Sequence, residues 1–328
     1  GDSEVPFTVT VSENNGNLSA STNTSTVEYD LYYSAEGTLN SSNYKINIAL
    51  EGREWIGTDS FRFALEGANS TTISEISKGN IFLGTSSITV NHAGEYSFGN
   101  ITFKKEGMYS FKIRQLGVDS NGLTIDNAVR SLDVVVTDVN HNGELRVQHS
   151  LLGSLTFTNR YSSEVIIEGR DIPVRTTMLD SSNNTMEWDG QEFTYKLQPS
   201  DNATKTAITN GYITLGNTSI TIDEDNNVYD SYKEGYFGNI KITKEGTYNF
   251  EVIQTTTAQD GFNYDTKKVM KIVATDNNLG AIDIELSGEF TFINRYSSSG
   301  ILNGVYAMST IEGRQWKDDD SFTYTLEG

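Results

Sequence analysis

One long segment of this chain occurs twice. Residues 98–111 read FGNITFKKEGMYSF, and residues 237–250 read FGNIKITKEGTYNF. Other features return in the same order. Each of the three tryptophans precedes an alternating aromatic run, and a Phe-x-Asn-Arg-Tyr segment recurs. The recurring features are Trp55, Trp188 and Trp316, the runs 61–63, 193–195 and 322–324, and the segments 157–161 and 292–296. A chain that repeats one unit is usually an array, and arrays serve length or display more often than catalysis.

Apolar and polar residues alternate through the most regular segments, 61–65, 109–115, 193–197 and 248–254. A period of two is typical of strands with one buried face, and no helical period is sustained anywhere. Glycine-containing segments between these runs predict tight hairpins. The predicted turns are 105–107, 244–246, 14–16 and 140–143. The pattern predicts an all-β fold of tandem antiparallel Ig-like β-sandwich repeats in an elongated array.

The phase of the repeat predicts the domain boundaries. Residues 29–33 align with the closing segment 157–161, and residues 7–11 align with 132–136. We therefore expect residues 1–33 to be the C-terminal part of a preceding repeat and 297–328 the N-terminal part of a following one. Residues 34–161 and 162–296 are predicted to be two complete repeats. Such a chain fits a piece of a longer array; the alternative is that the two partial repeats complete one another between neighbouring molecules by strand donation.

Composition excludes several classes of partner. The net charge is −20, which disfavours binding to nucleic acid or to an anionic membrane, since both require basic surface. The chain has no cysteine, so it has neither a disulfide framework nor a thiolate metal site. It is 36% hydrophobic, which is enough to fill several cores, yet no apolar run reaches the length of a membrane span.

The ordered motifs resemble one family. An opening Glu-Gly-Arg-x-Trp occurs at 51–55 and 312–316, the Phe-Gly-Asn strand follows, and Phe-x-Asn-Arg-Tyr closes each repeat. Together they resemble the streptococcal pilin isopeptide-linkage domain of Gram-positive pilus backbones and wall-anchored adhesin stalks. The resemblance implies a covalent bond, made when a lysine of the first strand attacks an asparagine of the last strand and releases ammonia. The lysine must be desolvated and neutral, and a nearby acid must be kept protonated by an apolar site.

The reactive positions depart from the family pattern. The lysine position holds Ile48 in the first repeat and Ser309 in the last partial one, and falls near Thr176 or Thr177 in the second. The acid positions hold Gln115 and Gln254, whereas Asn159 and Asn294 keep the asparagine; the earliest partial repeat has Leu31 there. We expect repeats that keep the fold and lack the bond, with Gln115–Asn159 and Gln254–Asn294 as buried amide pairs joined by hydrogen bonds. The alternatives are Lys45 as the nucleophile, although it lies on the opposite strand face, and an ester from Thr177 or Ser309.

Other polar features have simpler interpretations. The acidic runs 223–227 and 318–320 lack the full ligand spacing of a calcium loop and are interpreted as solvated loops. His92, His141 and His149 are scattered and are expected on the surface. The tryptophans could stack on a sugar, but their fixed place in the repeat favours packing beside the first strand. We expect no metal, cofactor or catalytic residues.

The sequence therefore predicts a non-enzymatic stalk or fibre on the surface of a Gram-positive bacterium, which holds a binding tip away from the cell wall. Its partners would be neighbouring repeats of the same protein. Two alternatives remain. The repeats could be adhesin modules that bind a host protein or glycan, or subunits of a filament that assembles end to end.

Overall fold

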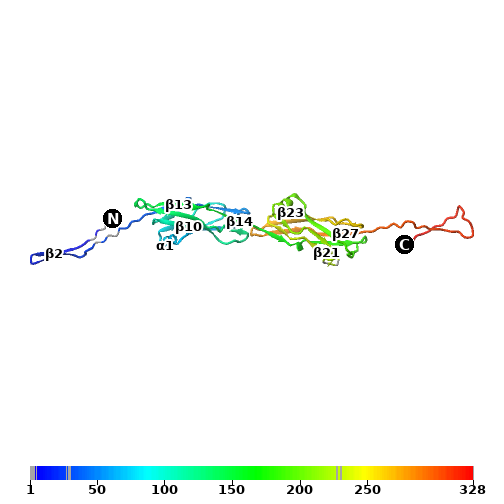
Figure 1. Ribbon diagram of the computed structural model, residues 1–328, viewed down its shortest axis with the longest axis horizontal. Coiled ribbons are helices and arrows are strands. Elements are labelled where there is room, and N and C mark those ends of the chain that lie inside the picture. The colour runs from blue at the N-terminus through cyan, green and yellow to red at the C-terminus, as the bar shows by residue number, and fades with distance from the viewer. Residues whose placement is uncertain are drawn as a thin grey trace. The chain divides into compact units, whose positions relative to one another are not determined.

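The chain forms two compact units, seen in a computed structural model that describes residues 4, 6–26, 28, 31–226, 228–229 and 231–327 (Figure 1). One unit runs to Ser162 and adds Asn278–Gly280, and the other comprises Ser163–Asn277 and the chain from Ala281 onward. Each unit contains one β-sandwich. We call residues 34–162 the first domain and residues 163–296 the second domain.

The first domain places three sheets around one core. Their strand orders are β13-β12-β10-β5-β7, β11-β14-β4-β8 and β3-β9-β6. The strands are β3 (Gly37–Leu39), β4 (Ile46–Glu51), β5 (Phe61–Gly67), β6 (Ile81–Leu83), β7 (Ser87–Val90), β8 (Gly94–Tyr96), β9 (Ile101–Phe103), β10 (Gly107–Leu116), β11 (Leu123–Thr124), β12 (Arg130–Thr137), β13 (Arg146–Leu152) and β14 (Thr156–Tyr161).

The second domain repeats this plan. Its strand orders are β19-β17-β23-β25-β26, β20-β21-β16-β27-β24 and β15-β22-β18. The strands are β15 (Val165–Ile167), β16 (Pro173–Leu179), β17 (Phe193–Pro199), β18 (Ile213–Leu215), β19 (Ser219–Ile222), β20 (Val228–Tyr229), β21 (Tyr232–Tyr236), β22 (Ile240–Ile242), β23 (Gly246–Gln254), β24 (Phe262–Asn263), β25 (Lys267–Asp276), β26 (Ile282–Ser287) and β27 (Thr291–Tyr296). The all-β fold predicted from the alternating pattern is confirmed.

One feature of the sheets differs from the antiparallel prediction. β4 and β14, which lie far apart in sequence, pair in parallel, and β16 and β27 do the same. A parallel pair needs a long crossover rather than a hairpin, and here almost the whole domain is that crossover. Local turn signals cannot reveal such a pairing, so the sequence pattern did not indicate it.

The hairpin predicted at 105–107 is wrong. β9 pairs with β3 and β6, whereas β10 pairs with β5 and β12, so this segment crosses between two sheets. The Tyr109 hydroxyl donates to the carbonyl oxygens of Lys105 and Glu106, each at 3.1 Å, and holds the crossing. A Cβ on Gly107 would lie 2.8 Å from the Tyr109 ring, which explains the glycine there. The same correction applies to 244–246, where Tyr248 bonds to the carbonyl oxygen of Lys244 at 2.8 Å.

The other two predicted turns are confirmed. The segment 140–143 lies between the antiparallel strands β12 and β13. Asn15 and Gly16 join β1 (Val9–Asn14) to β2 (Asn17–Thr22), with φ of 50° and 80°. Two consecutive left-handed residues are typical of the turn that matches strand twist.

Each domain also has one short helix that the alternating pattern did not indicate. α1 (Ser70–Ser77) begins after Asn69, whose side chain accepts a hydrogen bond from the Thr72 amide at 2.8 Å. α2 (Asn202–Thr209) begins after Asp201, which accepts from the Thr204 amide at 2.7 Å. Two turns of helix are too short for a clear period, but both caps could have been found as Asn or Asp before a Thr-rich segment.

The inward strand faces form two separate cores. In β10 the predicted face Tyr109, Phe111, Ile113 and Gln115 is buried, and so are Phe157, Asn159 and Tyr161 of β14. Full burial of a side chain such as Phe111 stabilises the fold by about 1.5–3 kcal/mol. The sequence pattern therefore predicted correctly which face of β10 and which face of β14 point into the first core.

Outside the two domains, the described chain has little structure of its own. All residues of β1 and β2 are exposed, and residues 297–327 contain only turns and coil. Within the segment 312–322, Trp316 still packs edge-on against Phe322, and Arg314 pairs with Asp320 at 2.7 Å. Among the described residues, no helix has the length and apolarity to cross a membrane.

Candidate cross-link positions and a polar pocket

In the first domain the predicted lysine position is apolar and sealed. Ile48 of β4 is 1% exposed and lies beside Phe157 of β14 in the parallel register. Asn159 is fully buried two residues further along, and its side-chain oxygen accepts a hydrogen bond from the Asp126 amide at 3.0 Å. Ile48 offers no nucleophile, so the family's bond to Asn159 cannot form from this position.

The predicted amide pair of the first domain is not joined by hydrogen bonds. Gln115 is buried on the inner face of β10, but neither atom of its amide has a hydrogen-bond partner in the described chain. The side-chain nitrogen of Asn159 also has none. The prediction placed both side chains in the core correctly and was wrong about their contact. The core of the first domain therefore contains buried amide atoms that make no hydrogen bond, although most buried polar groups in proteins make one.

A carboxylate that the sequence analysis missed lies next to Asn159. Asp126 accepts from the amide of Thr158 at 3.1 Å and pairs with Arg130 at 3.0 Å. The Arg130 guanidinium lies 4.8 Å above the Phe157 ring, so this pair covers the core beside the closing strand. The second domain repeats the arrangement, with Lys268 bonded to Asp265 at 2.6 Å and lying 5.6 Å from the Phe292 ring. The recurrence of an Asp a few residues before β12 and β25 in the two repeats was the available signal.

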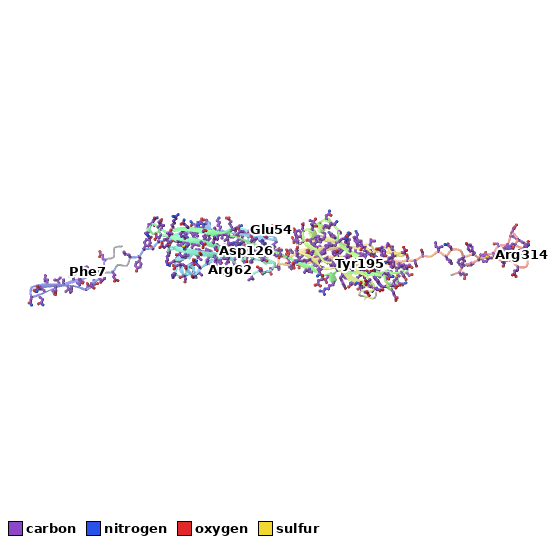
Figure 2. All side chains as sticks on the ribbon, in the orientation of Figure 1. Phe7, Glu54, Arg62, Asp126, Tyr195 and Arg314 are labelled. Carbon is purple, nitrogen blue, oxygen red and sulfur yellow. The ribbon has the colours of Figure 1, made fainter. Side chains whose placement is uncertain are left out.

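In the second domain Thr176, rather than Thr177, corresponds to Ile48. Thr176 pairs in register with the phenylalanine of β27, as Ile48 does with the phenylalanine of β14. Thr176 is fully buried, and its hydroxyl is 2.7 Å from that of Tyr195. Burial raises the pKa of Tyr195, with smaller opposing contributions from Thr176 and Asn294, so the phenol stays neutral. Tyr195 is labelled on the second domain in Figure 2 and is fully buried there.

The amides of the second domain are also left largely unpaired. Asn294 is fully buried beside the Tyr195 hydroxyl, but neither atom of its amide makes a hydrogen bond of normal geometry. The nitrogen of Gln254 reaches the Thr256 hydroxyl at 3.4 Å, and its oxygen has no partner in the described chain. The second predicted amide pair is therefore absent as well.

The lysines nearest these strands are used elsewhere. Lys45 points to solvent and pairs with Glu95 at 3.3 Å, as expected from its strand face. Lys233 is buried, at 3% exposure, and pairs in register with Thr176. Its amine donates to the carbonyl oxygens of Glu224 and Asn226 and lies 5.2 Å from the Trp188 ring. This buried lysine holds a loop and was not anticipated from the sequence.

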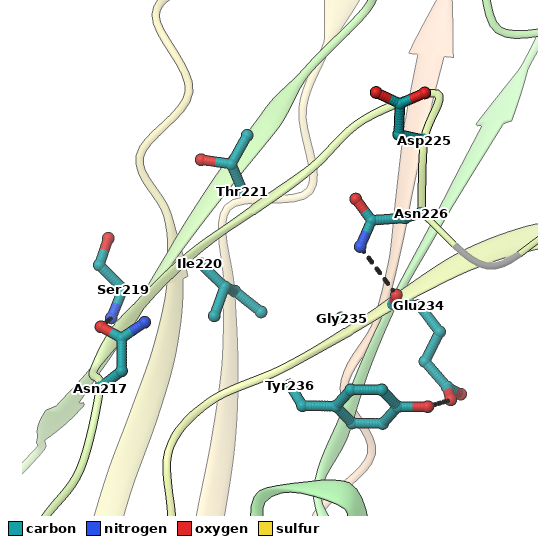
Figure 3. Close-up of a pocket in the computed structure, with 9 residues that line it drawn as sticks. All are labelled: Asn217, Ser219, Ile220, Thr221, Asp225, Asn226, Glu234, Gly235 and Tyr236. Carbon is teal, nitrogen blue, oxygen red and sulfur yellow. Dashed lines mark hydrogen bonds between the residues drawn. The ribbon is translucent and has the colours of Figure 1, made fainter.

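The second domain also has an open polar pocket of about 520 Å³ between β19 and β21 (Figure 3). Its walls carry amide, hydroxyl and carboxylate groups. The lining residues are Asn217, Ser219, Ile220, Thr221, Asp225, Asn226, Glu234, Gly235 and Tyr236. Within it Asn226 donates to the Glu234 carbonyl at 3.2 Å, and the Tyr236 hydroxyl donates to the Glu234 carboxylate. Glu234 also pairs with Arg175 at 2.9 Å, so its charge is already neutralised.

The remaining predicted features lie on the surface or in packing roles. The three histidines are exposed, and no group of three or more His, Cys, Asp or Glu side chains among the described residues could hold a metal. Trp55 and Trp188 pack edge-on against Phe61 and Phe193, with ring centroids 5.2 and 5.3 Å apart.

The remaining candidate residues that the structure describes lie outside helices and strands. Asp223 and Asp225 lie in turns, while Asn227 lies outside the described residues. Ser309 is half-exposed in coil, and Leu31 is 94% exposed. Neither of these two residues lies in a core comparable to that of Asn159 or Asn294.

Comparison with solved structures finds similarity to pilus proteins. The chain is similar to the major pilin of Streptococcus pyogenes (14% identity, covering 81% of this chain and 100% of that one, TM-score 0.27). It is also similar to the basal pilin SpaE (11%, 78% and 90%, TM-score 0.21) and the pilus adhesin SpaC (11%, 87% and 35%, TM-score 0.19), both of Lactobacillus rhamnosus GG. Among curated protein sequences none matches significantly.

The sequence itself gives the stronger relation. Residues 44–162 and 178–297 each match the family described as the Spy0128-like isopeptide containing domain. These two matches together span most of the chain, and each falls on one sandwich. The chain therefore belongs to the Spy0128-like isopeptide containing domain family and carries two copies of that domain.

Proposed function

We propose that this chain is a non-enzymatic structural segment of a Gram-positive surface fibre or stalk, and that neither domain forms an internal cross-link. One observation carries the proposal: both copies keep the buried asparagine, yet the lysine position holds Ile48 or Thr176 and the acid position holds Gln115 or Gln254. A glutamine cannot donate and recover a proton as a carboxyl group does, and isoleucine is not a nucleophile. The fold is kept without the family's covalent chemistry.

The distribution of aromatic residues supports a structural role. Most aromatic side chains of the two domains lie on inward strand faces, among them Phe63, Phe111, Phe193 and Phe250. Among the aromatic residues of the first domain, only Phe82 is largely exposed, at 48%. A net charge of −20 keeps such a surface from sticking laterally to copies of itself.

The proposed boundaries follow the repeat. Residues 34–161 and 162–296 are the two complete repeats, and residues 1–33 and 297–328 are parts of neighbouring repeats. Limited proteolysis tests this division, and we expect early cuts in 23–33 and 297–310 and two resistant fragments. Early cuts inside either sandwich would contradict it.

Intact mass spectrometry of the folded protein tests the missing cross-link. We expect the wild type to have the full mass calculated from its sequence, with no loss of ammonia. The Asn159→Ala and Asn294→Ala variants should likewise have the masses calculated from their own sequences. A wild-type mass short by one or two ammonias, restored by these variants, would overturn the proposal. Immunogold electron microscopy of a Gram-positive host then tests location, where label along surface fibres is expected and label confined to the cytoplasm would contradict it.

A second function, an adhesin module, is favoured by the polar pocket of the second domain. Its hydroxyl and amide groups, with half-exposed Tyr236 at its rim, suit a saccharide or a polar peptide. Binding of glycans and extracellular host proteins to wild type, but not to a Ser219→Trp variant that fills the pocket, would support this function. Equal binding by both would count against it. Filaments of purified protein in micrographs would instead support end-to-end assembly.

A further inference from the structure

We propose that the parallel pairs β4–β14 and β16–β27 act as non-covalent shear clamps that resist tension along the chain. This inference rests on the proposed function, because a stalk or fibre carries load from one end of its chain to the other. It assigns to hydrogen bonds and packing the resistance that a covalent bond would otherwise supply.

The paired strands are the first long strand and the last strand of each domain. In the first domain five residue pairs are in register, from Asn47–Thr156 to Glu51–Arg160. In the second domain five pairs run from Arg175–Thr291 to Leu179–Arg295. Between them lies nearly the whole of each sandwich, so neither domain can extend while its pair stays closed.

The direction of the strands determines how tension acts. Tension pulls β4 toward its own N-terminal end and β14 toward its own C-terminal end. Because the strands are parallel, these two pulls act in opposite directions along the shared ladder. The strands must slide past one another, and all five pairs resist together rather than breaking in turn. A parallel pair of entry and exit strands is therefore the arrangement that loads the most bonds at once.

Contacts on both faces of the ladder oppose sliding. At the start of the ladder the Asn47 amide donates a further hydrogen bond to the Leu155 carbonyl at 3.1 Å. At its end the Arg160–Glu51 ion pair, at 3.0 Å, joins the two strands through their side chains. The inner face is fixed by Ile48 and Phe157, which are almost completely buried. Sliding by one residue would turn these side chains out of the core, so the register itself is strongly held.

The second clamp has more support on its outer flank. β16 pairs with β21 over four residue pairs, whereas β4 pairs with β8 over three. Arg175 also bonds to Glu234 across that flank at 2.9 Å, and its amide donates to the Phe290 carbonyl at 2.9 Å. We therefore expect the second domain to yield at the higher force of the two.

The segment that precedes β4 adds a weaker contact. Glu36 exchanges backbone hydrogen bonds with Gly143 and Leu145 at 3.0 and 2.9 Å, and β3 then pairs with β9 over three residue pairs. Tension reaches β3 at its end, so its bonds break one after another. Release of residues 34–45 should come first, at low force, before the clamp takes the load.

Single-molecule stretching in two directions tests the first clamp. The chain has no cysteine, so two introduced thiols give specific handles. Handles at Ser34→Cys and Ser162→Cys load the ladder in shear, whereas handles at Ser34→Cys and Ser154→Cys pull on the start of both strands and unzip them. We expect a several-fold lower rupture force in the second geometry, although every bond of the clamp is the same. Equal forces would overturn the proposal.

A substitution test uses the shear handles. Ala49→Pro removes a ladder donor at the centre of β4, and Gln148→Pro does the same in the outermost strand β13, which is off the load path. We expect Ala49→Pro to lower the rupture force and Gln148→Pro to leave it unchanged; the reverse result would overturn the clamp. If Ala49→Pro does not fold, the two-direction comparison decides alone. A domain that never ruptures in shear would reveal a covalent cross-link, which contradicts the proposed function rather than the loading geometry.

Discussion

The two domains share a sandwich but fill the same core positions differently. The first has Ile48 and Phe63 at two of these positions, and the Phe63 ring centroid lies 5.0 Å from that of Phe157. The second has Thr176 and Tyr195 at the matching positions, and their hydroxyls bond to each other at 2.7 Å. A hydroxyl is tolerated in this core only because its partner changed as well. The pair, rather than the single residue, is the unit that varies.

The helices differ in a similar way. In the first domain Glu75 of α1 is buried and bonds to Lys78 and Lys105 at 3.0 and 3.4 Å. In the second domain α2 has Ala207 at the corresponding place, and Lys244 lies 4.5 Å from the Tyr212 ring instead. A charged network and a cation–π contact thus support the same helix position. The first should respond to pH and the second should not.

The largest expected effect comes from restoring the family's reactive residues. Ile48→Lys with Gln115→Glu restores an amine and an acid at the two positions that the family uses, and the Asn159 carboxamide is oriented by the Asp126 amide. We expect the mass of the folded protein to fall by one ammonia and the free energy of unfolding to rise by about 5 kcal/mol, as for a cross-link that closes a loop of this length. The matched control Ile48→Lys with Gln115 unchanged should stay unlinked and be destabilised by its buried amine. An unlinked double variant would show that more than these two positions was lost.

The next largest effect tests the hydroxyl pair. Tyr195→Phe leaves the Thr176 hydroxyl buried without this partner and should cost about 1–3 kcal/mol of the free energy of unfolding, whereas Tyr195→Phe with Thr176→Val should recover most of that loss. The reciprocal change Phe63→Tyr in the first domain should also destabilise, because Ile48 cannot accept its hydrogen bond. Hydrogen exchange resolved by domain gives the measurement. Additive effects of the two second-domain substitutions would contradict the pairing.

Most of the fold could be predicted from the sequence, because strand parity is a local property. The buried faces of β10 and β14 follow from alternation alone, and the repeat locates both asparagines in a core. Three features were not accessible in this way. The parallel β4–β14 pair joins segments with no local signal, the Lys105 connection crosses between sheets although it has the composition of a hairpin, and the amide contacts depend on side-chain distances that parity does not fix.

The helix caps give a smaller effect and a matched comparison. Asn69→Ala and Asp201→Ala each remove the side-chain acceptor for one helix amide, and each should cost about 1 kcal/mol in its own domain. Asp201 also accepts from Asn249 at 2.7 Å, so its loss should be the larger of the two. Denaturant unfolding followed by domain-resolved exchange measures both. Equal or reversed losses would show that the contact with Asn249 adds nothing.

The smallest effect is a dependence on pH confined to the first domain. Hydrogen bonds from Asn80 and Lys78, with the charge of Lys105, lower the pKa of Glu75 to about 2. Because the folded pKa lies below the ordinary value of about 4.3, this stabilisation is complete above that pH and is lost as the pH falls toward 2. We expect Glu75→Gln to weaken the loss of first-domain stability in this window and to leave the second domain unaltered. Unfolding midpoints measured from pH 6 to pH 2 would contradict this if the variant and the wild type declined in parallel.

The parallel pairing of entry and exit strands has a genetic consequence. In each domain the chain arrives at one end of the β4–β14 or β16–β27 ladder and departs from the other, so a copy can be duplicated or deleted without rerouting any strand. The segments 98–111 and 237–250 still share 9 of their 14 residues, as copies that arose by duplication would. Strains could therefore vary the number of copies freely, while each surviving copy folds as before.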